Sequence, residues 1–95
     1  MGLQELRRNI DLIDEQIVAL LNRRAAEVKQ AGQIKAAAGL PLVDRAREAK
    51  IYSQIAADNA GEIKTDALLR IYAQIVAESR TLQLQVKAEN GEAVQ

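Results

Sequence analysis

Three observations predict an all-α fold of three helices. Apolar residues recur at three- and four-residue spacing, the 95-residue chain contains a single proline, and two clusters of turn-forming residues, at 39–41 and 58–61, interrupt the pattern. The composition, 48% hydrophobic and 27% charged, is that of one small ordered domain.

The first helix is predicted from Leu3 to Ala38. Gly32 lowers helix propensity there, but the alanines at 36–38 favour continuation past it. Gly39 suits the position after a helix, and Pro41 cannot extend one. The apolar face of this helix consists of Leu3, Leu6, Ile10, Ile13, Ile17, Leu20, Leu21, Val28 and Ala31.

Positive side chains lie on this same face. On a helical wheel, Arg24 and Lys35 fall within roughly 20° of the centre of the apolar stripe, and Arg7 lies at its edge. One such cation is most simply an internal salt bridge or a side chain that extends to the rim. Three would each need a carboxylate, and the stripe supplies none. We therefore interpret the cations as lining a pocket for an anion.

The length of the first helix bears on the assembly. About 35 residues form a rod of roughly 50 Å, whereas a compact chain of this size has a radius of gyration of about 13 Å. Either the helix breaks near Gly32 or a second chain packs along it. We expect an intertwined homodimer with two-fold symmetry.

The second helix is predicted from Val43 or Asp44 to about Ala57. Spacing places Asp44, Arg47 and Glu48 on the face that carries the isoleucines of this helix. A helix N-cap is an equal alternative for Asp44. Arg47 and Glu48 could be surface residues, but the opposite face is already charged, so we expect a polar cluster that points inward.

The third helix is predicted from a cap at Thr65 or Asp66 to about Val86. Ser79 and Gln83 take the next two positions of its apolar line. A serine within a helix usually bonds to its own backbone, and a glutamine near a C-terminus is usually solvated. Together, however, they would place a hydroxyl and an amide beside the same cavity.

Composition excludes several kinds of function. Lysine plus arginine equal aspartate plus glutamate at 13 each, so no basic field favours nucleic acid. The chain has no cysteine and no histidine, which removes disulfides, the usual zinc sites and the usual general base. No signal sequence or apolar run of membrane-spanning length is present, which suits a cytoplasmic protein with no membrane partner. We expect no metal and no cofactor.

The excess of inward cations suits a small ligand with two carboxylates, which arginine can bind in bidentate fashion. Four segments carry a resemblance that covers nearly the whole chain: LRRNIDLIDEQIVALLNRR (6–24), GQIK (32–35), PLVDRARE (41–48) and ESRTLQ (78–83). In order and separation they resemble the all-helical chorismate mutases. The resemblance implies a mutase domain at 1–88, followed by a flexible tail at 89–95.

The resemblance also implies an activity. The family rearranges chorismate to prephenate in the shikimate pathway of aromatic amino acid biosynthesis, in an intertwined dimer of three-helix subunits with two equivalent active sites. Arg24, Lys35 and Arg47 would bind the substrate carboxylates and ether oxygen from one subunit. Arg7 would reach in from the other subunit.

The remaining site residues take roles from the same resemblance. Asp44 and Glu48 would hold the substrate hydroxyl or orient the cations, and Ser79 would contact a carboxylate or the hydroxyl region. Gln83 would donate to the ether oxygen alongside Lys35. The residues expected to act in catalysis are Arg24, Lys35, Glu48 and Gln83.

Two alternatives stay open. Isochorismate-pyruvate lyases resemble the same scaffold, although the acidic pair Asp44 and Glu48 favours the mutase. A non-catalytic dimerisation module would instead use the inward charges as bridges between subunits. Family members are often joined to other enzymes of the pathway, and we expect this chain to be free-standing.

Overall fold

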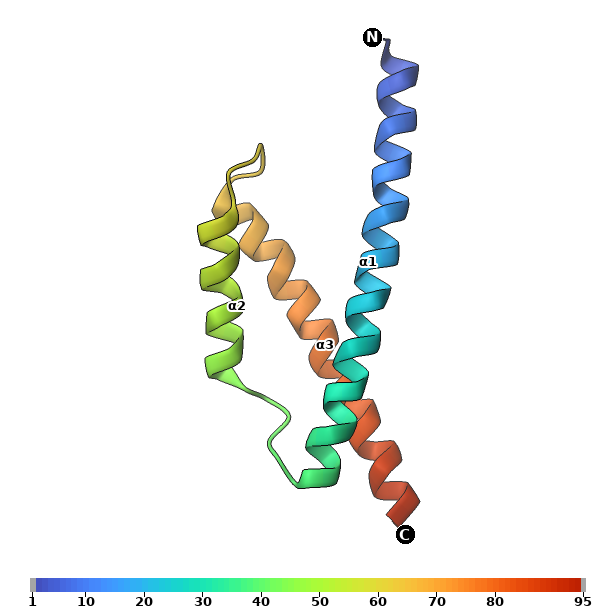
Figure 1. Ribbon diagram of the computed structural model, residues 1–95, viewed down its shortest axis with the longest axis vertical. Coiled ribbons are helices and arrows are strands. Elements are labelled where there is room, and N and C mark those ends of the chain that lie inside the picture. The colour runs from blue at the N-terminus through green and yellow to red at the C-terminus, as the bar shows by residue number, and fades with distance from the viewer. Residues whose placement is uncertain (1, 95) are drawn as a thin grey trace.

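The computed structural model describes residues 2–94, with side chains for 2–89. Three α-helices follow one another along the chain: α1 (Leu3–Ala38), α2 (Arg45–Asp58) and α3 (Thr65–Val94) (Figure 1). No strand occurs within the described range. The predicted all-α fold of three helices is confirmed.

Helix α1 begins and ends at the residues that the sequence predicts. It runs unbroken through Gly32 for 36 residues. Gly39 then adopts the left-handed conformation, with φ of 68°, and its amide donates to Ala36 O at 3.3 Å. The Leu40 amide donates to Lys35 O at 2.8 Å, so the last carbonyls of the helix are satisfied.

Helix α2 starts directly after Asp44, which is its N-cap. Asp44 Oδ1 accepts a hydrogen bond from the Arg47 amide at 2.9 Å. The capping alternative for Asp44 is therefore confirmed, and it holds Arg47 in the first turn beside the pocket described below.

Helix α3 begins at Thr65, as predicted, and Asn59 orders the turn before it. Asn59 Nδ2 donates to Ile63 O and to Thr65 Oγ1, both at 2.9 Å. The predicted end near Val86 is wrong, because the helix continues to Val94. A lone glycine costs a helix only about 1 kcal/mol. The flexibility expected of 89–95 stays a prediction, and Gln95 lies outside the described residues.

The helices do not form a compact unit. Helix α3 packs across the C-terminal half of α1, and α2 packs on α3, while the N-terminal half of α1 stands apart from both (Figure 1). The radius of gyration is 17.0 Å, and the extents are 60 × 26 × 14 Å. This radius of gyration exceeds the roughly 13 Å of a compact chain of this length.

Much of the apolar surface is consequently uncovered. Val76 and Val86 are buried, each 4% exposed. The large apolar residues in the first two thirds of α1 are between 40% and 63% exposed; they are Leu3, Leu6, Ile10, Leu12, Ile13, Ile17, Val18, Leu20 and Leu21. The expectation that one chain cannot cover this helix is confirmed, and the dimer itself stays a prediction. Within the described residues, no helix combines the length and apolarity needed to cross a bilayer.

Candidate functional site

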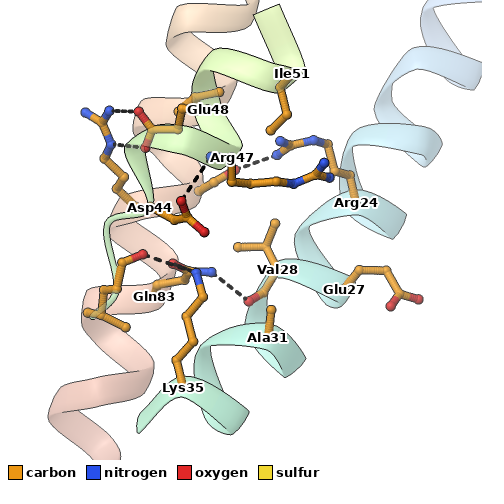
Figure 2. Close-up of a pocket in the computed structure, with 14 residues that line it drawn as sticks. Arg24, Glu27, Val28, Ala31, Lys35, Asp44, Arg47, Glu48, Ile51 and Gln83 are labelled. Carbon is orange, nitrogen blue, oxygen red and sulfur yellow. Dashed lines mark hydrogen bonds and ion pairs between the residues drawn. The ribbon is translucent and has the colours of Figure 1, made fainter. Parts of the chain in front are cut away.

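A cavity of about 290 Å³ lies between the three helices, at the low end of the volumes usual for small-molecule sites. Figure 2 shows the polar side chains that converge on it from α1, α2 and α3. Seven of the eight predicted site residues line it: Arg24, Lys35, Asp44, Arg47, Glu48, Ser79 and Gln83.

Three of the four cations that line the cavity have no ion-pair partner among the described side chains, whereas Arg80 is paired with Glu48. Among the side chains at 2–89, no carboxylate lies within ion-pair distance of Arg24, Lys35 or Arg47. Arg24 Nη1 instead donates to Ser79 Oγ at 2.6 Å, and that hydroxyl donates to Ile75 O at 2.9 Å. Glu27 points away from the cluster (Figure 2). Arg24, Lys35 and Arg47 thus face the cavity without a carboxylate bound to any of them.

Lys35 and Gln83 meet at the floor of the cavity. Lys35 Nζ donates to Leu42 O at 3.2 Å and to Gln83 Oε1 at 3.5 Å. Gln83 is only 8% exposed, and its Nε2 donates to Val28 O at 3.4 Å. These hydrogen bonds are long, so a ligand atom with better geometry can replace them.

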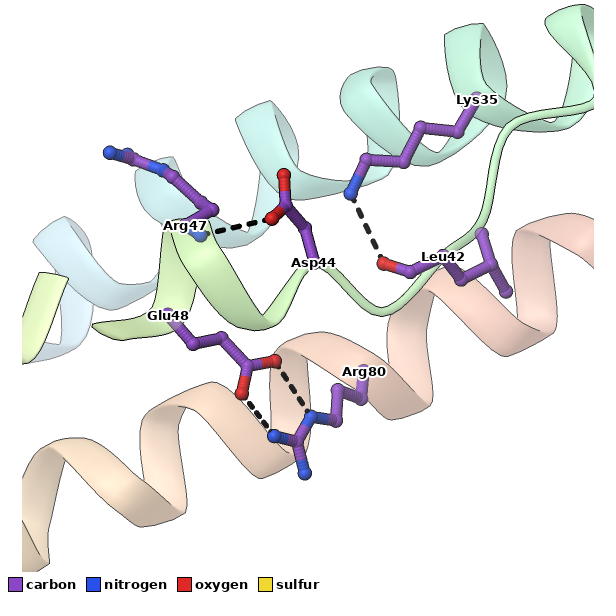
Figure 3. A network of polar contacts seen from close by, with 6 residues as sticks. All are labelled: Lys35, Leu42, Asp44, Arg47, Glu48 and Arg80. Carbon is purple, nitrogen blue, oxygen red and sulfur yellow. Dashed lines mark hydrogen bonds and ion pairs between the residues drawn. The ribbon is translucent and has the colours of Figure 1, made fainter. Parts of the chain in front are cut away.

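Asp44 and Glu48, the two acidic residues at the start of α2, have different partners. Asp44 caps the helix through Oδ1. Glu48 receives two hydrogen bonds from Arg80 of α3, from Nε to Oε2 at 3.0 Å and from Nη2 to Oε1 (Figure 3). The hydrogen bonds from Arg80 lower the pKa of the Glu48 carboxyl, so this group stays ionised.

Arg7 is the predicted site residue that the fold does not bring to the cavity of its own chain. It is exposed on the N-terminal part of α1, where it precedes Arg24 by 17 residues. That separation corresponds to roughly 25 Å along a helix axis. The cavity of its own chain is therefore out of reach for the Arg7 side chain.

Sequence reasoning missed three features of the site. Arg80 lines the cavity, and the Leu42 carbonyl accepts from Lys35. Gly32 is buried against α3, where an added Cβ would lie 3.2 Å from Gln83 Cγ. A glycine three residues before Lys35 was the available signal for this close approach. No local pattern signals the Arg80 and Leu42 contacts, which join residues of different elements.

The arrangement of these groups suits electrostatic chemistry. Two guanidinium groups and an ammonium group can hold an anionic ligand. Lys35 Nζ lies beside the Gln83 amide, whose Oε1 accepts from it and whose Nε2 donates to Val28 O. Within the described residues, no group of three or more carboxylates is close enough to hold a metal ion.

Comparison with known proteins places this chain in a family. The model of the family "Chorismate mutase type II" matches residues 6–84. The bifunctional chorismate mutase/prephenate dehydratase of Aquifex aeolicus (strain VF5) is 39% identical over 89 residues, which cover 90% of this chain and 25% of that protein. The chorismate mutase of Methanocaldococcus jannaschii is 40% identical over 53 residues, which cover 56% of this chain and 54% of that protein. The match thus spans about a quarter and about half of the length of these two relatives.

A solved structure agrees in fold and in length. Chorismate mutase (Form II) from Thermus thermophilus superimposes with a TM-score of 0.83 at 27% identity, covering 85% of this chain and 92% of that one. The matched segment 6–84 contains all eight predicted site residues. This chain belongs to the chorismate mutase type II family.

Proposed function

We propose that the cavity binds chorismate and rearranges it to prephenate, a step toward aromatic amino acids. The observation that carries the proposal is the set of Arg24, Lys35 and Arg47 around a cavity of about 290 Å³, with no carboxylate paired to any of them among the described side chains. Arginine and lysine held in this way suit a guest with two carboxylates. The family model and the relatives above are mutases, which favours this reaction over the lyase.

The rearrangement is intramolecular, since one carbon–oxygen bond breaks as one carbon–carbon bond forms. It needs no covalent help from the protein. Clamping both carboxylates would select the folded, near-attack conformer of the substrate. Negative charge that develops on the ether oxygen would be stabilised by Lys35 and Gln83. A rate gain of about 10⁶ corresponds to roughly 8 kcal/mol, which these two effects can supply together.

The neutral and acidic groups would set the orientation of the substrate. The Ser79 hydroxyl, held between Arg24 and Ile75 O, would contact a carboxylate or the hydroxyl region. Glu48 would accept from the substrate hydroxyl with the lone pairs that Arg80 leaves unused. Asp44 has its second oxygen available for the same task or for orienting Lys35 and Arg47.

A second copy of the chain would complete the site. The exposed apolar stripe at 3–21 is the surface that two-fold pairing would bury. Arg7 would then reach the cavity of the partner. We place this homodimer, free of any metal or cofactor, in the cytoplasm, consistent with a chain that lacks cysteine.

Mixing inactive variants tests the shared site. Arg7→Ala and Arg24→Ala should each reduce activity to roughly 1% or less, because a buried substrate carboxylate loses its partner. Co-refolding the two variants in equal amounts should restore about a quarter of wild-type activity, because half of the dimers are mixed and each holds one intact site.

A matched mixture supplies the control. Arg24 and Lys35 come from the same helix, so a mixed dimer of Arg24→Ala and Lys35→Ala has no intact site. This mixture should stay inactive. Restored activity in the control, or none in the first mixture, would contradict a site that two chains share.

The reaction itself is tested by product analysis. The protein is incubated with chorismate and, separately, with isochorismate, and the formation of prephenate and of pyruvate is measured. We expect loss of chorismate with stoichiometric prephenate. Pyruvate from isochorismate without prephenate from chorismate would assign the lyase reaction. The absence of both products would favour the non-catalytic dimerisation module.

A further inference from the structure

Glu48 is held on the α3 side of the cavity by Arg80. Both oxygens of the carboxylate are engaged, with Nε to Oε2 at 3.0 Å and Nη2 to Oε1. In Figure 3, Glu48 points toward α3 while Arg47, one residue earlier, points toward α1. The Glu48 side chain is 16% exposed and that of Arg80 is 44% exposed, and both residues line the cavity.

This orientation separates Glu48 from the other charges that surround it. The titratable and charged groups near it on the three helices are Arg24, Glu27, Lys35, Asp44, Arg45, Arg47, Tyr52 and Arg80. An unrestrained carboxylate among them would be drawn to Arg24 and Arg47. Those are the groups that must receive the substrate carboxylates, so Glu48 would compete with the substrate for them.

We propose that Arg80 is a positioning residue that holds Glu48 toward α3, which leaves Arg24 and Arg47 open to the substrate and Glu48 available to its hydroxyl. The proposal rests on the proposed function. A bidentate guanidinium uses two of the roughly four lone-pair directions of a carboxylate, so acceptor capacity remains for a substrate hydroxyl. The same contact lowers the pKa of Glu48, which keeps the acceptor ionised in mildly acidic solution.

The test uses the variants Arg80→Gln and Arg80→Lys. Each is made in two backgrounds, the wild-type protein and Glu48→Gln. For Arg80→Gln we expect KM to rise about tenfold with a smaller change in kcat, because Glu48 then competes for the carboxylate clamp. Since Arg80 lowers the pKa of Glu48, its removal raises that pKa, and the fall of kcat/KM in acid should begin at higher pH. Arg80→Lys keeps the positive charge, so its KM should lie between those of the wild type and Arg80→Gln.

The double variants separate the proposal from a direct or purely structural role. In the Glu48→Gln background, Arg80→Gln should change KM by less than about twofold, and the pH at which kcat/KM falls should not move. An equal effect in both backgrounds, or no effect of Arg80→Gln in either, would overturn the proposal. Arg70→Gln, which removes the exposed Arg70–Asp66 pair elsewhere on α3, is the matched control and should behave as wild type.

A measurement without substrate keeps this test independent of the proposed function. Carbon-13 NMR titration of the Glu48 carboxyl should give a higher pKa in Arg80→Gln than in the wild-type protein. An unchanged pKa would refute the positioning contact even in an active enzyme. An inactive wild-type protein with the expected shift would instead refute the proposed function and leave the contact standing.

Discussion

The Lys35→Ala variant is expected to lose about 10²- to 10³-fold in kcat while it stays folded in the same oligomeric state, because it removes one of the two donors at the developing charge. Among the side chains at 2–89, the hydrogen bonds of Lys35 Nζ are long, to Leu42 O at 3.2 Å and to Gln83 Oε1 at 3.5 Å. Both acceptors are uncharged, so the substitution breaks no ion pair. The loss should therefore appear in the rate rather than in stability.

Three measurements on Lys35→Ala check this expectation: single-turnover kinetics, thermal unfolding by circular dichroism, and mass in solution by light scattering. Lys29→Ala, on an exposed position of the same helix, should match wild type in all three. A dimerisation module predicts the reverse, namely that Lys35→Ala weakens the assembly. If Lys35→Ala separates into monomers, and its remaining activity is proportional to the fraction of dimer, a direct catalytic role of Lys35 is contradicted.

The helices could be predicted from sequence because local chemistry sets their ends. Gly39 has the left-handed conformation that terminates α1, and Asp44 caps α2 through the Arg47 amide. Where the signal was weak, the prediction was wrong: α3 passes Val86 and continues to Val94. A residue of low helix propensity ends a helix only when its unfavourable free energy exceeds the helix propensity of the residues around it. The spacing of apolar residues does not measure that balance.

The candidate site was predictable to the extent that a helix face determines it. Arg24 and Lys35 are eleven residues apart, close to three turns, so they had to lie on one face of α1. The contacts between helices were not predictable in the same way. The pairing of Glu48 with Arg80 and the approach of Gly32 to Gln83 depend on how α2 and α1 pack on α3. Arg7 shows a further limit, because no pattern within one chain states whether its side chain enters the cavity of a second copy.

The Gln83→Glu variant is expected to lose activity as the pH rises, with a loss of about 10²-fold or more at pH 7.5 relative to wild type. The amide of Gln83 donates at every pH, whereas a glutamate donates only when protonated. The active form of the variant is thus the neutral acid. Its rate should be highest below the pKa of the new carboxyl and fall about tenfold per pH unit above it.

The surroundings of position 83 decide whether the acid form is reached under mild conditions. The side chain is 8% exposed and faces the Val28 carbonyl at 3.4 Å, and both features favour the neutral acid. Lys35 Nζ at 3.5 Å favours the ionised form. Single-turnover rates at saturating substrate between pH 4.5 and 8.5 should therefore rise toward acid, while Gln85→Glu, exposed on the same helix, should follow the wild-type profile. A flat profile for Gln83→Glu in a folded protein would mean that this side chain does not donate to the ether oxygen, and the stabilisation would then rest on Lys35 alone.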